Sequence, residues 1–400
     1  MRISKTLTPL ALAALLVACS SEEEVSQDIL TEEGMVEIKL SAGGSGSTTR
    51  GSIESDADGL FEANGLGIFM LATHKLNINP DEQAISWDPA VNEWAVWWNN
   101  VEANAVKDVD HTNIDVTWPT GDKHRWYPVG SWYSYRFYAY YPRVADSEVT
   151  TTDGRRTVHY ANLDGTTDII WGRSLGADMS DTHEKYRYCA RYFRQDGYGD
   201  KYPTLALEHK LMRLQFCVKG VADPNKPGHE YDDANTMMVK SVTLEAVPAS
   251  ATLIVCDRPT NGTGGDLAGT IEFDWSANAT QNLNLRTNDG PFDPATSQVN
   301  NDNLIDIGDP IMLPVPDAKA VQAGFTHFKV WVDLCDTSGQ VFPAERPIEL
   351  QLDANKDFEI GKTYRVVLQI AGPREVTLRA TLQQWDDSDQ GDVVNPLEFN

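Results

Sequence analysis

Several side chains in this sequence are of types that carry catalysis, but none stands at the spacing that the chemistry needs. Gly361-Lys362-Thr363 resembles the end of a phosphate-binding loop, yet Lys356 occupies the place of the first glycine of that motif. A strand-like run also follows it, where phosphate binding needs a helix N-terminus. The eight histidines form no His-Glu-x-x-His motif, and no Gly-x-Ser-x-Gly turn occurs. We therefore expect a protein that is not an enzyme, with no catalytic residue, no cofactor and no metal site.

Two further clusters have a weaker claim to bind a ligand. The acidic run at residues 386–392 could offer oxygens to Ca²⁺, but the terminal bidentate Glu of a calcium loop is missing, so a solvated turn is favoured. Some tryptophans could stack against sugars, although buried cross-strand aromatics explain them at least as well: Trp94, Trp97, Trp98, Trp126 and Trp132.

The overall charge excludes another class of partner. The 400 residues carry a formal net charge of −26 at pH 7, and so acidic a surface repels nucleic-acid phosphates. The chain is 41% hydrophobic, which is enough for packed cores and argues against intrinsic disorder. At roughly 100–200 residues per domain, its length predicts two or three domains.

The beginning of the chain has the pattern of an export signal. Arg2 and Lys5 precede an apolar run over residues 7–18, which is too short to span a bilayer of about 30 Å as a helix. The run ends in a Leu-Val-Ala-Cys tetrapeptide that resembles a bacterial lipobox, in which the Cys becomes the acylated first residue. The alternative is an ordinary secretory signal with an accidental Cys. We expect a signal peptide at residues 1–18, a lipid such as palmitate on Cys19, and an acidic tether at residues 19–34.

The segment after the tether has a strand pattern and an unusual attachment. Residues 36–42 alternate between apolar and polar side chains, with Val36, Ile38 and Leu40 on one face, which predicts a half-buried strand. A flexible linker rich in Gly, Ser and Thr follows over residues 43–49 and ends in Arg50-Gly51. A protease could therefore reach this linker in the folded protein.

Strand signals continue along the chain without crossover helices, which predicts an all-β protein built from antiparallel β-sandwiches. The polar residues 221–236 are the best boundary and give an N-terminal domain at 35–222 and a C-terminal domain at 223–400, although a boundary near residue 203 remains an alternative. The expected strands lie at residues 66–72, 94–98, 114–118, 133–140, 169–171, 211–218, 239–246, 251–256, 270–275, 328–334, 364–370 and 376–385.

Four cysteines remain after Cys19, and an even count in an exported protein permits one or two disulfides. Cys217 and Cys256 lie in strand-like runs, which favours core thiols for both. The disulfide state of Cys189 and Cys335 stays open.

Short motifs occur in a characteristic order along the chain. Thr49-Arg50-Gly51 is followed by motifs at residues 138–142, 168–172, 207–211 and 358–364, and the last strand ends in Gln384-Trp385. Together with the lipoprotein start and its acidic residues 22–24, this order resembles the fimbrillin family, the subunits and tip proteins of type V pili of Bacteroides-type bacteria. The resemblance implies two transthyretin-like antiparallel β-sandwich domains in tandem, and a structural or cell-adhesion role in a fimbrium at the outer membrane.

The resemblance also implies an assembly mechanism. An arginine-specific protease would cut at Arg50-Gly51 and release the first strand, and a C-terminal strand of another subunit would take its place by donor-strand exchange. The expected partners are other pilus subunits, this protease, the outer membrane through the lipid anchor before maturation, and a ligand on a host or bacterial surface. A position in the shaft, at the tip or at the anchor stays open.

Burial energies are compatible with that cycle. Val36, Ile38 and Leu40 would each contribute about 1.5–3 kcal/mol, or about 5–9 kcal/mol together. A whole domain is stable by only about 5–15 kcal/mol. A vacated strand position would therefore need to be refilled, and strand addition restores main-chain bonds and apolar contacts together.

The favoured donor is the segment over residues 376–399, in which Pro396 interrupts the terminal run and lacks a ladder donor. Its two apolar sets are Val376, Leu378, Ala380 and Leu382, and then Val393, Val394, Leu397 and Phe399. The rival interpretation is a cell-surface glycan-binding lipoprotein, which would use exposed Trp side chains and would not need the Arg50 linker.

Overall fold

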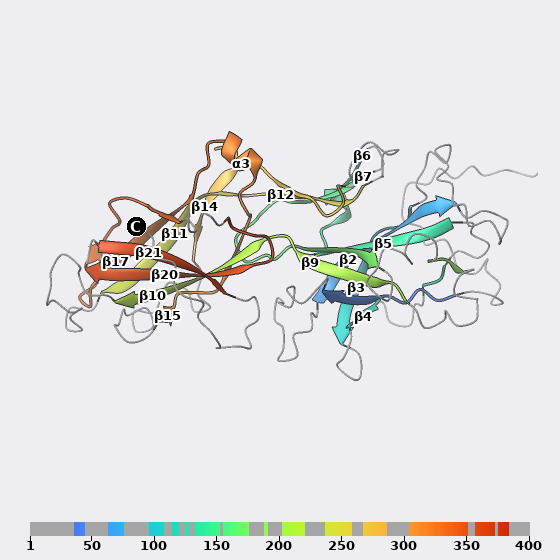
Figure 1. The fold of residues 1–400 in the computed structure, drawn as a ribbon, viewed down its shortest axis with the longest axis horizontal. Coiled ribbons are helices and arrows are strands. Elements are labelled where there is room, and N and C mark those ends of the chain that lie inside the picture. The colour runs from blue at the N-terminus through green and yellow to red at the C-terminus, as the bar shows by residue number, and fades with distance from the viewer. Residues whose placement is uncertain are drawn as a thin grey trace, which may run out of the picture.

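The computed structural model describes residues 36–44, 63–75, 96–107, 114–119, 125–127, 133–152, 155–175, 188–190, 202–220, 237–257, 267–285, 304–350, 357–372 and 375–383. Within these ranges the molecule is almost entirely β (Figure 1), as the strand signals predict. It includes the short helix α3 (Ala318–Gln322), whose N-terminus is capped by the Asp317 side chain, and a 3-10 turn at Asp146–Glu148. None of the helices in this part of the chain is long and apolar enough to cross a membrane.

A closed barrel forms the N-terminal half, with strand order β1-β4-β3-β2-β5-β8-β9. Its strands bury every second side chain in the barrel core, because successive side chains of a strand point to opposite faces. In β4, for example, Ile114 and Val116 are buried, whereas Asp115 and Thr117 are exposed. The strands are β1 (Ser41–Gly44), β2 (Ala63–Lys75), β3 (Val96–Lys107), β4 (Ile114–Thr117), β5 (Tyr133–Tyr141), β8 (Ile170–Leu175) and β9 (Thr204–His209).

Two further sheets form the C-terminal half, at the left of Figure 1. One has the order β15-β10-β20-β21, with β16 also on β10, and comprises β10 (Met212–Gly220), β15 (Ile305–Asp306), β16 (Ile311–Leu313), β20 (Thr363–Gly372) and β21 (Glu375–Gln383). The other has the order β14-β11-β17-β18, with β19 also on β17, and comprises β11 (Met238–Pro248), β14 (Thr280–Asn284), β17 (Phe328–Cys335), β18 (Val341–Phe342) and β19 (Ile348–Leu350). Buried residues of both sheets belong to one hydrophobic cluster.

A fourth sheet joins the two halves of the chain. Its order is β13-β12-β7-β6, so two strands from each half pair in it: β6 (Val149–Thr152), β7 (Arg155–Tyr160), β12 (Ala251–Cys256) and β13 (Ile271–Phe273). Arg155 reinforces the β7–β12 contact through an ion pair to Asp257, with 3.1 Å between Nε and Oδ1. The halves are therefore connected by backbone pairing as well as by sequence.

The wall formed by β2 and β5 is buried on both faces. Ile68 and Met70 belong to the barrel core, whereas Phe69 and Leu71 belong to the core of the C-terminal half. Tyr138 of β5 also belongs to that second core. A strand covered on both sides reads as a continuous apolar run, which explains why residues 66–71 lack the alternation of a half-exposed strand.

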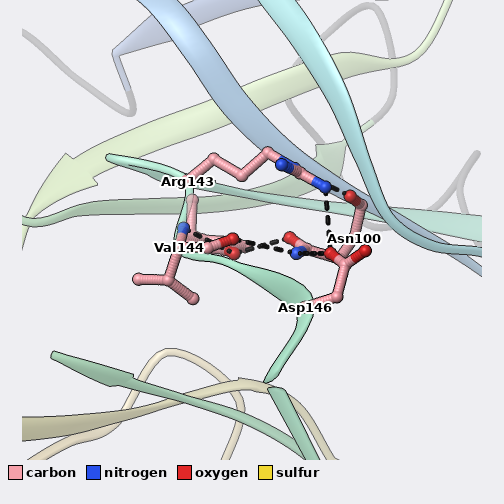
Figure 2. A network of polar contacts seen from close by, with 5 residues as sticks. Asn100, Arg143, Val144 and Asp146 are labelled. Carbon is pink, nitrogen blue, oxygen red and sulfur yellow. Dashed lines mark hydrogen bonds and ion pairs between the residues drawn. The ribbon is translucent and has the colours of Figure 1, made fainter. Parts of the chain in front are cut away.

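A polar network fixes the segment that leaves the barrel toward β6 (Figure 2). Asn100 of β3 is buried and has a φ of 58°. Its Oδ1 accepts a hydrogen bond from the Tyr140 hydroxyl at 2.5 Å, and its Nδ2 donates to the Val144 carbonyl at 3.1 Å and to Asp146 Oδ1 at 2.6 Å. Arg143 Nε donates to the Asn100 carbonyl at 2.9 Å. The side chain of one residue thus holds β3, β5 and the exit segment together.

The hydrophobic pattern of the sequence was sufficient to predict many of the strands of the described residues. Every predicted strand overlaps an observed one, and antiparallel pairing dominates as expected, but β1–β9 and β10–β20 are parallel pairs. The chain changes from the barrel to the C-terminal sheets between β9 and β10, at residues 210–211, which lies between the two boundaries that the sequence offers, near residue 203 and at 222/223. Cys217 and Cys256 are core thiols as predicted, and the four described cysteines, which include Cys189 and Cys335, are buried and form no disulfide with one another.

Candidate functional site

The sequence predicts functional residues near both ends of the chain, and the structure describes part of each. Val36, Ile38 and Leu40 are described, as is the candidate donor up to residue 383. The predicted lipidation residue, the predicted cleavage residues and the far part of the donor lie outside the described residues: Cys19, Arg50, Gly51, Val393, Leu397 and Phe399.

Residues 36–44, called here the N-terminal segment, close the barrel between two edges. On one side lie residues 114–116 and 125–127, called here the β4 edge. The Ile38 amide donates to the Arg125 carbonyl at 2.7 Å, and the Tyr127 amide donates to the Val36 carbonyl at 2.9 Å. The Val116 amide donates to the Leu40 carbonyl at 3.0 Å, after which β1 continues antiparallel to β4.

The opposite side of the N-terminal segment is residues 202–207, called here the β9 edge. The Ser41 amide donates to the Pro203 carbonyl at 3.1 Å, and β1 then runs parallel to β9 as far as Gly44 opposite Leu207. Side chains add to the pairing, since the Ser41 and Thr204 hydroxyl oxygens lie 2.9 Å apart. The N-terminal segment is therefore hydrogen-bonded on both sides, unlike the edge strand of an open sheet.

The inward side chains of the N-terminal segment complete the barrel core. Ile38, Leu40 and Ala42 are 2%, 3% and 8% exposed, whereas Lys39 between them is exposed. Val36 is half-buried and packs against the same cluster. Burial of Ile38 and Leu40 contributes about 1.5–3 kcal/mol each. The alternation predicted for residues 36–42 is present as far as Ala42.

An aromatic cluster supports the β4 edge. The Arg125 guanidinium lies 5.3 Å from the Trp98 ring centre and 5.0 Å from the Trp118 ring centre. Trp98 is only 6% exposed and also packs against Phe137, with 5.7 Å between ring centres. Its indole is therefore part of the barrel core, which removes one of the sugar-stacking candidates.

The described part of the candidate donor is a strand of the C-terminal half. β21 pairs antiparallel with β20, and among the described strands it pairs with β20 alone. Val376 lies opposite Ile370 and packs against the large core, and the pairs Leu378–Leu368, Ala380–Val366 and Leu382–Tyr364 continue the register. Donation of this part would therefore require β21 to leave β20.

Comparison with known protein families identifies the family of this chain. The sequence model of the fimbrillin-like family matches residues 49–385. The chain belongs to the fimbrillin-like family. The match includes every barrel strand except β1, because it begins after the N-terminal segment.

Solved structures similar to this fimbrillin-like chain share little sequence with it. A candidate cell adhesion protein of Bacteroides uniformis is 16% identical, with 89% of this chain and 100% of that chain covered and a TM-score of 0.43. A fimbrial assembly protein of Parabacteroides distasonis is 11% identical, with coverages of 87% and 99% and a TM-score of 0.29. The fimbrial anchor protein Mfa2 of Porphyromonas gingivalis is 9% identical, with coverages of 88% and 98% and a TM-score of 0.30. No curated protein sequence matches the chain.

Two of the short sequence motifs, at residues 168–172 and 207–211, converge where the barrel of this fimbrillin-like chain meets its C-terminal half. Asp168 and His209 are buried with side chains 0% and 3% exposed, and their Oδ2 and Nδ1 atoms lie 2.6 Å apart. The Lys210 ammonium lies 4.7 Å from the Trp171 ring centre and forms an ion pair with Glu208. Burial lowers the pKa of Lys210, and Glu208 opposes that shift. Motifs 168–172 and 207–211 are thus joined by side chains.

The motif at residues 358–364 reaches the same place through the backbone. The Gly361 amide donates to the Leu211 carbonyl at 2.9 Å, and the Arg213 amide donates to the Lys362 carbonyl at 2.9 Å. The Gly-Lys-Thr sequence therefore forms the turn into β20 beside the barrel exit, which gives it a structural role. We call residues 168–171, 208–211 and 361–362 the junction cluster.

Sequence reasoning missed the residues that flank the N-terminal segment. Arg125 and Tyr127 of the β4 edge and Tyr202 and Thr204 of the β9 edge belong to short stretches that carry little periodic signal. Their role arises from pairing with a segment far away in the sequence. The aromatic residues near Arg125, which include Trp98 and Trp126, are the available signal, and their pattern in the sequence is equally compatible with sugar stacking.

Proposed function

We propose that this fimbrillin-like protein is a structural or adhesive subunit of surface pili. It is exported as a lipoprotein precursor, is cut after Arg50 and is assembled by donor-strand exchange. Its place is the outer membrane before maturation and the fimbrium afterwards. Family membership supports the pilus role, and the lipobox-like Cys19 and the linker before Gly51 support the export and cleavage steps.

One observation carries the proposal: the N-terminal segment closes the barrel by pairing on both sides, yet it precedes a Gly/Ser/Thr linker that ends in Arg50. A cut after Arg50 would leave that segment held by noncovalent contacts alone. Its departure would expose the β4 edge and the β9 edge together, and would uncover the apolar surface that Ile38 and Leu40 cover. Unpaired backbone groups and bare apolar surface are both costly, so another strand is expected to enter.

The partner strand must meet the same physical demands. It needs backbone groups for both edges and an apolar residue at every second position. Residues 376–399 supply alternating apolar side chains in this chain, so the proposed partner is another pilus subunit that presents such a C-terminal strand. An arginine-specific protease is the second proposed partner.

Limited proteolysis of the full chain tests the proposal. An arginine-specific protease should cut the folded protein early after Arg50, and the cut protein should form oligomers whose size grows with concentration, as measured by size-exclusion chromatography with light scattering. Arg50→Lys is the matched control, because it keeps the charge and removes the recognised residue. Clean cleavage that leaves a stable monomer at every concentration, or normal oligomers from uncut Arg50→Lys protein, would contradict the proposal.

A further inference from the structure

The contacts of the N-terminal segment involve its outward side chains as well as its inward ones. The Lys39 ammonium lies 5.3 Å from the ring centre of Tyr202, at the distance of a cation–π contact. The Ser41 hydroxyl oxygen lies 2.9 Å from that of Thr204. Two alternate positions of the β9 edge thus contact two outward positions of the N-terminal segment, of which one is cationic and one carries a hydroxyl group.

The outward contacts can distinguish one register of the strand from another, which the inward contacts cannot do alone. Burial of Ile38 and Leu40 supplies affinity, but any strand with apolar residues at alternate positions would supply something similar. A slip by one residue turns the apolar face outward and is excluded. A slip by two residues keeps the apolar face inward, so it is disfavoured mainly by moving the cation from Tyr202 and the hydroxyl from Thr204.

The combination of these outward and inward residues is rare in the sequence. The pattern apolar, Lys or Arg, apolar, Ser or Thr, apolar occurs in two places: residues 38–42 and residues 378–382. In the second place Arg379 corresponds to Lys39, and Thr381 corresponds to Ser41. The second place lies in β21, which among the described strands pairs on one side only.

The inward side chains of the two segments have a similar total volume but occur in a different order. Residues 38, 40 and 42 are Ile, Leu and Ala, whereas residues 378, 380 and 382 are Leu, Ala and Leu. The small side chain moves from the third inward position to the second. Cores tolerate such redistribution when the total volume is kept, so local repacking around residues 40 and 42 is sufficient.

We infer that Tyr202 and Thr204 select the incoming strand and set its register, and that its source is a second copy of this chain, presented through residues 378–382. Arg379 of the second copy then lies over Tyr202, and its Thr381 hydroxyl pairs with Thr204. This inference rests on the proposed replacement of the N-terminal segment, and it adds the residues that discriminate one alternating strand from another.

Peptide exchange tests the inference on the full chain cut after Arg50. A fluorescent peptide of residues 375–383 and one of residues 36–44 are each added, and exchange with the cut segment is followed by fluorescence anisotropy. We expect both peptides to bind. A control peptide that combines Arg379→Thr with Thr381→Arg keeps the composition and the inward face, and it should bind about twofold to tenfold more weakly. A specific protease site placed within residues 45–49 permits the same measurement if Arg50 resists cleavage.

The outcomes separate the inference from the proposed function. Binding of peptide 36–44 without binding of peptide 375–383 would overturn the inference and leave strand replacement intact. Failure of both peptides would overturn strand replacement itself. Equal binding of the native peptide 375–383 and of the control peptide with Arg379 and Thr381 exchanged would show that the outward side chains do not contribute to selection, which would overturn the inference.

Protein variants then assign the selection to its residues. Tyr202→Leu should weaken binding of peptide 375–383 by about twofold to fivefold, whereas Tyr202→Phe should retain it, because the ring makes the contact. On Tyr202→Leu protein an Arg379→Leu peptide should lose nothing more, since the pair is already broken. If the Arg379→Leu peptide bound Tyr202→Leu protein more weakly than the native peptide did, by the same factor as on the unmodified protein, Tyr202 would not be the residue that contacts Arg379.

Discussion

Leu40 shows how much of the barrel depends on a single side chain of the N-terminal segment. It is 3% exposed, and its replacement by Ala would leave a cavity beside β4 and β9. We expect Leu40→Ala to lower the free energy of unfolding by about 2–5 kcal/mol in urea denaturation. Glu102→Ala, on the exposed face of β3, is the control and should change it by less than about 0.5 kcal/mol. Equal effects of the two variants would mean that the segment is not part of the core.

Buried tyrosines and cysteines make stability depend on alkaline pH. Burial raises the pKa of Cys217 from 9.0 to about 12, and it raises the pKa of Tyr140 and of Tyr364 from 10.0 to about 12. The folded state therefore keeps these protons at a pH where the unfolded state has released them. The stabilisation is complete below pH 9 and decreases as pH rises from 9 to 12.

Urea denaturation between pH 8 and pH 12 measures this dependence. The free energy of unfolding should fall steadily above pH 9. In Cys217→Ala protein the fall between pH 9 and pH 10 should be smaller, because burial raises the pKa of both Cys217 and Cys335 from 9.0 and only Cys335 then remains. A free energy of unfolding that rises between pH 9 and pH 12 would contradict the assigned burial.

At the scale of elements, loss of the N-terminal segment should change two edges and little else. After cleavage and removal of that segment, the amide protons of β4 and β9 that face it should exchange faster, because their partners are gone. Those of β10 and β20 should keep their protection, since these strands pair with each other. Hydrogen exchange with mass spectrometry checks both, and uniform loss of protection would indicate unfolding instead.

Local pattern predicted the elements that have one buried face. Residues 36–42 and 114–118 alternate in the sequence, and their burial alternates in the structure, because one face of each segment is solvated. The regular strand β1, however, covers Ser41–Gly44 and not the whole of residues 36–42. A strand was predicted over residues 66–72 and is present. The burial of residues 66–71 on both faces was not predicted, because the second core is formed by residues that are distant in the sequence. The pairing of Arg125 and Tyr202 with the N-terminal segment could not be predicted from local pattern, since these partners are distant in sequence.

At the scale of the whole molecule, the junction cluster is expected to make the two halves unfold together. Removing the Asp168 carboxylate breaks its buried hydrogen bond to His209, so Asp168→Ala should lower the free energy of unfolding by about 1–3 kcal/mol. Both halves should lose protection to the same extent in hydrogen exchange, because β2 and β5 belong to both cores. Asp309→Ala, at an exposed site, is the control. Loss of protection in one half alone would show that the halves are independent.

The pairing of Ser41 with Thr204 joins positions 163 residues apart. During synthesis the N-terminal segment is made early, but its β9 partner is made much later, so the barrel cannot close until most of its strands exist. Contacts of such long range are formed at a high entropic cost and fold slowly. A newly made chain is therefore expected to pass through an unclosed form with bare edges, and a chaperone that covers those edges during export would protect it from premature association.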